Sequence, residues 1–360
     1  MITCLWTCAC LAQDLGPNVN SPYGINFHAP GGADLPVLAD EVKNCGIGWI
    51  RVDFNWFDIE TSQNNFNWAL YDTIVAVANS RNLIVFATIA YSPQWATLGA
   101  VRVGVPKDPA DWYDICYQCA RRYDGNHGHG IVKYWGMWNE ANLDGFFEGT
   151  QQQYIDIILK NGADGIHAGN PNAKVCGPEM AHLTSGDKDW YDWLRKSIEQ
   201  AGSKLDICTH HMYDGDGFRD ITDKLEHPTA FGGNPRMWGI ANPSVKEVLQ
   251  YAGWYGKPFW FTETGWESRD VGETNQANYY AGLLNDWCTG RPGRGWLHRI
   301  FFYELMDTPS FPSLSWGIVA LGPAHTISHR KPAYAAYKKF IKAHSPTPVG
   351  RHAKKRILVR

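Results

Sequence analysis

The strongest constraint in this sequence is an alternation, repeated eight times, of short apolar runs and longer amphipathic runs. The apolar runs are rich in β-branched and aromatic residues, as β-strands are, and are nearly continuous rather than interrupted by every second residue. Continuous runs are typical of strands that are covered on both faces, as in a parallel sheet wrapped by helices. The predicted strands are Tyr23 to His28, Trp49 to Phe54, Leu83 to Ala90, Val132 to Glu140, Lys174 to Met180, Leu205 to Tyr213, Pro258 to Thr264 and Arg299 to Leu305.

Helices are predicted between these strands and after the last one. Examples are Leu35 to Cys45, Trp68 to Asn79, Gln152 to Ala168, Trp190 to Ala201, Val245 to Gly253, Asn275 to Cys288 and Pro332 to Ala343. Eight strand–helix units of about 40 residues each predict an α/β fold, a single-domain (β/α)8 TIM barrel with moderately long loops. A doubly wound open sheet is the alternative, but the sequence has no GxGxxG after the first strand and no GxxxxGK[ST]. The barrel is expected to span residues 21–344.

The two ends of the chain differ from this pattern. Residues 2–12 are apolar and precede Gln13, which resembles the hydrophobic part of a secretion signal without its basic leading segment. Residues 1–20 are therefore expected to be a signal-peptide remnant or a disordered N-terminus, and the protein is expected to be secreted. Residues 345–360 contain Pro346, Pro348, Gly350 and a basic run, and we expect a disordered tail.

The net charge and the aromatic content restrict the kinds of partner that the protein can bind. The net charge is −3, and because the last ten residues carry five Lys or Arg and no acidic residue, the remainder carries −8. Because the chain without its last ten residues is this acidic, we do not expect nucleic acid or an anionic membrane as a partner. No stretch of about 18 apolar residues occurs, so no transmembrane helix is expected. The 17 Trp exceed what a core needs and favour a carbohydrate-binding cleft lined by aromatic rings.

Cysteine and histidine patterns give no metal site. Cys116 and Cys119 form a CxxC inside a helical run, and no second CxxC or zinc-spaced His pair accompanies it among the nine Cys. His127 and His129 lie in a glycine-rich stretch that is expected to be an ordinary loop. We expect neither a metal nor a cofactor.

Two glutamates stand at the ends of predicted strands where an active site of such a barrel forms. Glu140 ends the fourth strand and Glu263 ends the seventh, each after a run of apolar residues. An ionised carboxylate is costly there unless it is paired or used. Strands four and seven lie across the barrel from each other. Two opposed carboxyl groups at a barrel mouth are what glycoside hydrolysis requires, one as proton donor and one as attacking group.

At these residues the sequence resembles the clan A retaining glycoside hydrolases, most closely glycoside hydrolase family 39 and next family 5. The similar segments are Trp138-Asn139-Glu140-Ala141-Asn142-Leu143, Thr262-Glu263-Thr264-Gly265-Trp266, Ile50 to Trp56, Ala90 to Ala96, Asp206 to Tyr213 and Lys331-Pro332-Ala333-Tyr334. The resemblance spans roughly residues 23 to 342. Two departures are Ala141, where the family usually has Pro, and Tyr303-Glu304-Leu305, where the clan commonly has a Trp beneath the sugar.

The resemblance implies a role for each of several residues. Glu263 becomes the nucleophile, with Arg51 and Tyr213 as its cationic and hydrogen-bonding neighbours, and Glu140 becomes the acid/base. Asn139 is expected to hold the sugar 2-hydroxyl. Further expected substrate contacts, each of which could instead be packing, are His211, His28, Trp95, Trp138, Trp266 and Glu304. His210 should point away from the site, since adjacent strand residues alternate faces, and Glu179 should support the site from behind.

These residues predict a retaining glycosidase that cleaves β-glycosidic bonds in poly- or oligosaccharides, with xylan- or glucan-type chains favoured. Its partner is the carbohydrate substrate. Two other functions stay open at this point. One is a barrel that binds carbohydrate without cleaving it, although both carboxylates are present. The other is a transglycosylase that uses the same carboxylate pair.

Overall fold

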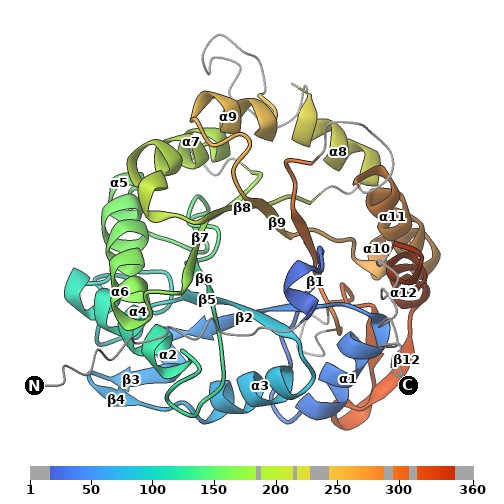
Figure 1. Cartoon of the computed structure of the whole chain (residues 1–360), viewed down its shortest axis with the longest axis horizontal. Helices are drawn as coiled ribbons and strands as arrows, with labels where there is room; N and C mark the ends of the chain where they lie inside the picture. Colours follow the sequence, from blue (N-terminus) through green and yellow to red (C-terminus); the bar gives the residue numbers. More distant parts are fainter. Residues whose placement is uncertain are drawn as a thin grey trace, which may run out of the picture.

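The computed structural model describes residues 17–183, 188–213, 217–227, 243–287, 295–307 and 314–344. Eight parallel strands form a closed barrel in the order β1-β10-β9-β8-β7-β6-β5-β2. Helices surround the strands (Figure 1), and the predicted (β/α)8 fold is thus confirmed. The barrel strands are β1 Tyr23–Asn26, β2 Trp49–Asn55, β5 Ile84–Ala90, β6 Tyr134–Met137, β7 Lys174–Ala181, β8 Ile207–His211, β9 Phe259–Glu263 and β10 Arg299–Phe302.

The outer helices start and stop where the sequence provides caps. In α1, the Asp34 side chain accepts a hydrogen bond from the Val37 amide, and Gly46 ends the helix with a φ of 92°, which favours glycine. The longer helices are α1 Leu35–Cys45, α3 Ala69–Ser80, α4 Pro109–Arg122, α6 Asn161–Gly169, α7 Trp190–Ala201, α8 Phe218–Glu226, α9 Val245–Tyr251, α11 Glu273–Asn285 and α12 Pro332–His344. No helix in the described part of the chain is long and apolar enough to cross a membrane.

Several shorter helices and hairpins lie outside the barrel sheet. They are α2 Trp56–Ile59, α5 Gln151–Gln153, α10 Ser268–Val271, and two antiparallel hairpins, β3 Glu60–Ser62 with β4 Asn65–Phe66 and β11 Val319–Leu321 with β12 Ile327–Arg330. The helical run predicted over Gln152 to Ala168 is confirmed, since residues 151–169 are helical throughout, and its middle part, Tyr154–Lys160, is a π-helix between α5 and α6. The long connection from β8 to β9 contains α8 as well as α9. Of residues 1–20, expected to be a signal remnant or a disordered N-terminus, the first 16 lie outside the described residues, and Pro17–Asn20 form a short 3-10 helix. The expected tail, residues 345–360, and Cys288 also lie outside the described residues.

Several barrel strands end earlier than their apolar runs. The predicted strand Val132 to Glu140 is paired only over Tyr134–Met137. Trp138 and Glu140 have φ values of 72° and 46°, in the left-handed region, so the backbone leaves the sheet directly after Met137. The strands predicted to reach Tyr213 and Leu305 likewise end earlier. Side chains that follow a strand are thereby freed to reach over the mouth of the barrel.

The interior of the barrel is apolar at one end and charged at the other. A cluster of Trp49, Phe86, Trp260 and Phe301, contributed by four strands, fills the end where the strands begin. The Arg299 guanidinium lies 3.7 Å from the centre of the Trp49 ring, which is a cation–π contact. Since side chains alternate along a strand, the inward series on β2 is Trp49, Arg51 and Asp53, so the next layer begins with a charge.

Gly24 on β1 tests how tightly this interior is filled. A methyl group at Gly24 would overlap the ring of the fully buried Phe301, which Trp49 and Trp260 hold in place. We expect Gly24→Ala to lower the free energy of unfolding by about 1–3 kcal/mol, because overfilled cores are strained. Urea denaturation measures this. The control, Gly31→Ala, has no atom within 4 Å of the added carbon and should change stability by less than about 0.5 kcal/mol. Equal effects of the two substitutions would contradict the packing argument.

Candidate active site

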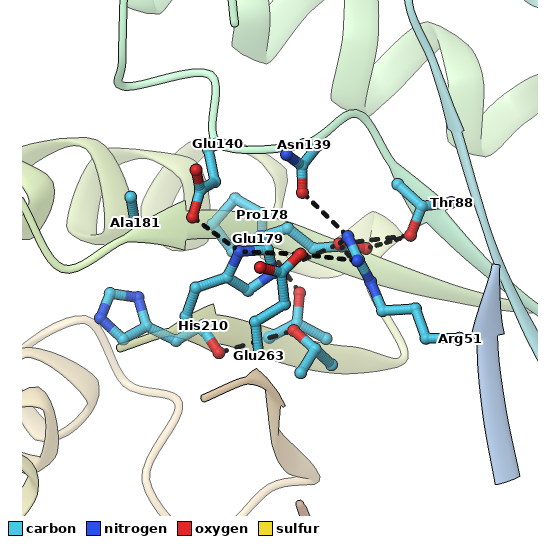
Figure 2. Close-up of polar contacts among 12 residues, drawn as sticks. Arg51, Thr88, Asn139, Glu140, Pro178, Glu179, Ala181, His210 and Glu263 are labelled. Atoms are coloured by element: carbon cyan, nitrogen blue, oxygen red, sulfur yellow. Dashed lines mark hydrogen bonds and ion pairs between the residues drawn. The ribbon is translucent and has the colours of Figure 1, made fainter. Parts of the chain in front are cut away.

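Arg51 organises the charged layer of the barrel. Its guanidinium is almost fully buried and donates to Glu263 Oε1 at 2.7 Å, to Asn26 Oδ1 and Asn139 Oδ1 at 2.9 Å each, and to Glu179 Oε2. Figure 2 shows Arg51 reaching toward Glu179 and Asn139 from one side of the site. One cation on the second strand therefore connects the first, fourth, fifth and seventh strands.

Glu263, the last residue of β9, is held in the ionised state. Burial alone would raise its pKa, but the positive charges of His211 and Arg51 and a hydrogen bond from Tyr213 outweigh burial, so the pKa lies below its ordinary value. The Tyr213 hydroxyl donates to Glu263 Oε2 at 2.6 Å, and Arg51 binds the other oxygen. Glu263 is thus fixed as a carboxylate whose two oxygens are both oriented.

Glu140 has the opposite electrostatic environment. Its pKa is raised, first by burial and also by the negative charge of Glu263, with a partial compensation from His211. No arginine binds Glu140 directly among the described residues, and its backbone amide donates to the Glu179 carbonyl at 3.0 Å, which fixes the loop after β6. The two glutamates therefore have pKa values displaced in opposite directions, as a proton donor and a nucleophile require.

His211, at the end of β8, connects the two carboxylates. Its Nδ1 lies 3.0 Å from Glu140 Oε1 and 3.6 Å from Glu263 Oε1, and its Nε2 lies 3.5 Å from Glu179 Oε2. Burial lowers the pKa of His211, but the three surrounding carboxylates raise it to about 9. Figure 2 shows Glu140 and Glu263 entering the site from different elements. One carboxylate oxygen of each glutamate and a His211 nitrogen all lie within 4.8 Å of one another.

This trio could in principle supply three ligand atoms to a metal ion. Its charges are already balanced by the protein, however. Arg51 and the protonated His211 face Glu179 and the ionised Glu263, while the raised pKa of Glu140 favours its neutral form. A metal would have to displace the proton of His211 and compete with Arg51 for Glu263.

A cavity of about 520 Å³ opens above the two glutamates. The residues that line it are His28, Asp53, Tyr91, Asn139, Glu140, Phe146, Leu183, Tyr213, Glu263, Tyr303, Leu314 and Trp316. A smaller recess of about 300 Å³ shares Tyr213 and Trp316 with it. The cavity lies at the carboxyl ends of the strands, where (β/α)8 enzymes have their active sites.

His28 and Asp53 form a second charged pair in this cavity. His28 Nε2 lies 3.4 Å from Asp53 Oδ2, and its Nδ1 lies 3.2 Å from Glu304 Oε2. Burial opposes the charge on His28, but the two carboxylates raise its pKa to about 10. Burial likewise opposes ionisation of Asp53, but the charge of His28 lowers its pKa to about 2. Between these values the pair is ionic.

The cavity contains five of the predicted site residues: Glu140, Glu263, Asn139, Tyr213 and His28. Arg51 and His211 do not reach it, because their side chains lie beneath the carboxylates and bind those instead. Arg51 is the cationic neighbour of Glu263, as predicted, but neither Arg51 nor His211 lines the cavity as a substrate contact. Both support the carboxylates from beneath, as Glu179 was expected to do. His210 points away, as expected, and lies 3.0 Å from His182.

Four predicted substrate contacts are not in the cavity. Trp138 is fully buried and donates to the Phe146 carbonyl, so it cannot serve as a sugar platform. Glu304 is also fully buried, beneath His28. Trp95 donates to the Glu60 carbonyl and packs on Trp56 outside the cavity lining.

The fourth, Trp266, faces the smaller recess and is nearly fully buried. The expectation that the surplus Trp lines a cleft is thus wrong for most of them. Among the described residues, Trp316 is the one Trp that lines the larger cavity; Trp138 and Trp266 are buried, and the partly buried Trp95 packs against the core.

Sequence reasoning missed several residues of the site, and Asn26 and Trp316 illustrate two reasons. Asn26 interrupts an apolar strand with an amide that accepts from Arg51 and donates to the Thr262 and Phe302 carbonyls, and this polar interruption was a usable signal. Trp316 follows β10 in a long connection and meets Tyr213 with ring centroids 5.2 Å apart. No local pattern marks Trp316 as a cavity residue.

Comparison with known proteins identifies the family. A family model described as Glycosyl hydrolases family 39 matches residues 42–268, more than half of the chain. The chain belongs to glycoside hydrolase family 39. The resemblance inferred from the sequence motifs is confirmed. The matched segment contains both Glu140 and Glu263.

Individual relatives agree with this assignment. A β-xylosidase of Caldicellulosiruptor saccharolyticus is 24% identical over 227 residues, which are 60% of this chain and 44% of that protein. The chain thus spans less than half the length of this relative. Among solved structures, a monomeric β-xylosidase from Caulobacter crescentus has a TM-score of 0.65 at 19% identity, covering 89% of this chain and 67% of that one. A family 39 glycoside hydrolase from Bacteroides cellulosilyticus has a TM-score of 0.64 at 17% identity, covering 89% and 63%. At such identities these structures show the shared fold.

Removing the buried cation tests the charged layer of this family 39 protein. We expect Arg51→Met to lower the free energy of unfolding by about 3–5 kcal/mol at pH 7, because Glu179 and Glu263 lose their buried partner. Glu263 has a lowered pKa, so its stabilising contribution exists above its ordinary value of 4.5 and is lost as the pH falls through the lower folded value. The deficit of the variant should therefore shrink below pH 4.5.

Urea denaturation at several pH values measures both effects. The control is Arg81→Met, which breaks a partly exposed ion pair with Asp40 and should cost about 1 kcal/mol or less. A deficit for Arg51→Met no larger than that of the control would show that Arg51 does not hold the layer together.

Proposed function

We propose that this family 39 protein is a retaining β-glycosidase in which Glu263 is the nucleophile and Glu140 the acid/base. The observation that carries the proposal is the spacing of oxygens from the two glutamates, within 4.8 Å across the cavity. Retaining enzymes hold their carboxyl groups about 5–5.5 Å apart, whereas inverting enzymes need about 6.5–9.5 Å to admit a water molecule. The spacing favours direct attack by a carboxylate.

The first step uses the opposite pKa shifts of the pair. The ionised Glu263 attacks the anomeric carbon as the bond from that carbon to the leaving oxygen breaks, and Glu140 donates its proton to that oxygen. A covalent glycosyl–Glu263 ester remains. Its formation removes the negative charge that helps to raise the pKa of Glu140, so Glu140 can stay ionised until the next step.

The second step reverses the first. Glu140 accepts a proton from a water molecule, whose oxygen attacks the anomeric carbon, and the ester bond to Glu263 breaks. His211 supports both steps, because it lies within 3.6 Å of both carboxylates and remains protonated up to about pH 9. Asn139, whose Oδ1 Arg51 holds at 2.9 Å, is suited to direct its amide nitrogen to the sugar 2-hydroxyl.

For the sugar we propose a neutral, xylose-type glycone. The relatives described as β-xylosidases support it. The charge of the cavity supports it as well. Among the described lining residues none is Lys or Arg, and both ring nitrogens of the cationic His28 face carboxylates, so the cavity offers no arginine or lysine to a negatively charged sugar such as a uronate.

Azide rescue tests the nucleophile. Glu263→Ala should lower kcat on 4-nitrophenyl β-xyloside by at least about 10⁴-fold while leaving the circular dichroism spectrum unchanged, because the covalent intermediate cannot form. Sodium azide should restore turnover and give the α-glycosyl azide, as a small anion in the vacated space attacks from the same face. Chromatography of the products measures the configuration. A β-configured azide from Glu263→Ala, or azide rescue of Glu140→Ala but not of Glu263→Ala, would show that Glu263 is not the nucleophile.

The pH profile tests both carboxyl groups at once. Activity should rise as Glu263 ionises and fall as Glu140 loses its proton, giving a bell-shaped dependence of kcat/KM. Tyr213→Phe removes a hydrogen bond that lowers the pKa of Glu263, so the acid limb should move to higher pH while the alkaline limb stays. The matched control is Tyr255→Phe, an exposed tyrosine outside the cavity lining, which should leave both limbs in place. If only the alkaline limb moved, Tyr213 would act on the pKa of Glu140 instead of Glu263, which would contradict the prediction.

A further inference from the structure

The two sides of the active-site cavity differ in chemistry. His28 and Asp53 follow or end β1 and β2, whereas Phe146 and Leu183 follow β6 and β7. In the closed order of the barrel, β1 and β7 lie opposite each other. We call His28 and Asp53 the ionic wall and Phe146 and Leu183 the apolar wall. The charged pair therefore lies on one side of the two glutamates and the apolar wall on the other, while Tyr303, Leu314 and Trp316, which follow β10 beside β1, add aromatic and apolar groups to the first side.

The ionic wall suits sugar hydroxyl groups. Asp53 keeps a low pKa and His28 a high one, so both are charged at neutral pH. Both ring nitrogens of His28 face carboxylates, Glu304 and Asp53, which leaves Asp53 as a charged acceptor that is partly exposed to the cavity. Charged acceptors make strong hydrogen bonds with hydroxyl donors.

The apolar wall is built rather than incidental. Leu183 is 59% exposed, yet its backbone is fixed, because the buried Asn142 side chain donates to the Leu183 and Ala181 carbonyls and accepts from the Ala181 amide. Phe146 is fixed by its carbonyl, which accepts from the Trp138 indole. Apart from Asn139 and Glu140, the described lining residues that follow β6 and β7 offer apolar groups only.

The positions of the glutamates decide which part of a substrate meets which wall. A proton donor must lie beside the leaving oxygen, so the leaving group extends past Glu140, whereas the sugar ring that is attacked lies against Glu263. Phe146 lies in the same loop as Glu140, after β6, Leu183 lies in the loop after β7, and the Asn142 side chain joins these loops. The ring then points toward the ionic wall, and the leaving group toward the apolar wall.

We propose that the apolar wall is a binding site for an apolar aglycone, so that the natural substrate is a β-glycoside of an alkyl or other hydrophobic alcohol rather than a chain of sugars. This inference rests on the proposed function for the orientation of the substrate. A second sugar would need hydrogen-bonding partners beyond Glu140, which the described part of this wall does not provide. An alkyl group would instead cover Leu183, whose side chain is otherwise exposed to water.

A binding series separates this proposal from the proposed function. The Glu140→Gln variant, in which the amide replaces the protonated carboxyl, binds substrate without turning it over. Isothermal titration with methyl, butyl and hexyl β-xylosides, parallel β-glucosides and xylobiose measures affinity. We expect affinity to rise about three- to fourfold for each methylene group that the wall buries. Hexyl β-xyloside should bind more tightly than xylobiose.

Leu183→Asn in the same background should flatten this dependence on chain length. The matched control is Leu98→Asn, a 71% exposed leucine in the loop between β5 and α4 that does not line the cavity, and it should leave the series unchanged. Affinity that is independent of chain length in both sugar series, tighter binding of xylobiose, or equal effects of the two leucine substitutions would each overturn the proposal. Hydrolysis of 4-nitrophenyl β-xyloside by the unaltered protein tests the proposed function separately. If the unaltered protein did not hydrolyse this compound, the proposed function would fail, but the binding series would still test the apolar wall.

Discussion

The buried guanidinium of Arg51 is the interaction on which the rest of the site depends. A single cation in the barrel interior binds Glu263 and Glu179 and orients Asn26 and Asn139. Several kcal/mol of desolvation must be offset before an arginine is stable in such a place, and only a full set of acceptors achieves this. Four strands that are distant in sequence are thereby joined at one group, and the ionised state of Glu263 follows from the same contact.

The apolar end of the barrel makes this charged layer possible. Trp49, Phe86, Trp260 and Phe301 close the interior below Arg51, so the carboxylates above them lie in a region of low dielectric where charge interactions are strong. The same burial raises the pKa of Glu140, because Glu140 has no arginine partner among the described residues. The pKa of Glu263 is lowered despite its burial, because Arg51 and His211 lie beside it. Two identical side chains thus acquire different protonation states from their positions relative to one cation and one histidine.

The residues predicted for the site divide according to how they reach it. Glu140, Glu263, Asn139, Tyr213 and His28 follow or end strands, and their place at the carboxyl end of a strand is sufficient to bring them to the cavity. Trp138 also follows a strand, but a left-handed backbone turns its ring into the core. Trp316 does the reverse, since a residue in a long connection returns to the cavity wall. Aromatic composition cannot distinguish these cases, because core packing and sugar binding use the same rings.

The sequence by itself determined the eight strands, their parallel order and the two glutamates at the ends of the fourth and seventh, because near-continuous apolar runs and costly strand-end charges are local signals. Tertiary structure alone decided which side of each strand faces the barrel interior, since both faces of these strands are buried and carry similar residues. It also decided the meeting of Arg51 with Asn26 and Glu179, the position of His211 between two carboxylates, and the contrast between the ionic and apolar walls. These arise when the barrel closes and brings together side chains that lie as many as 276 residues apart in the sequence, such as His28 and Glu304, and no local pattern encodes such a distance.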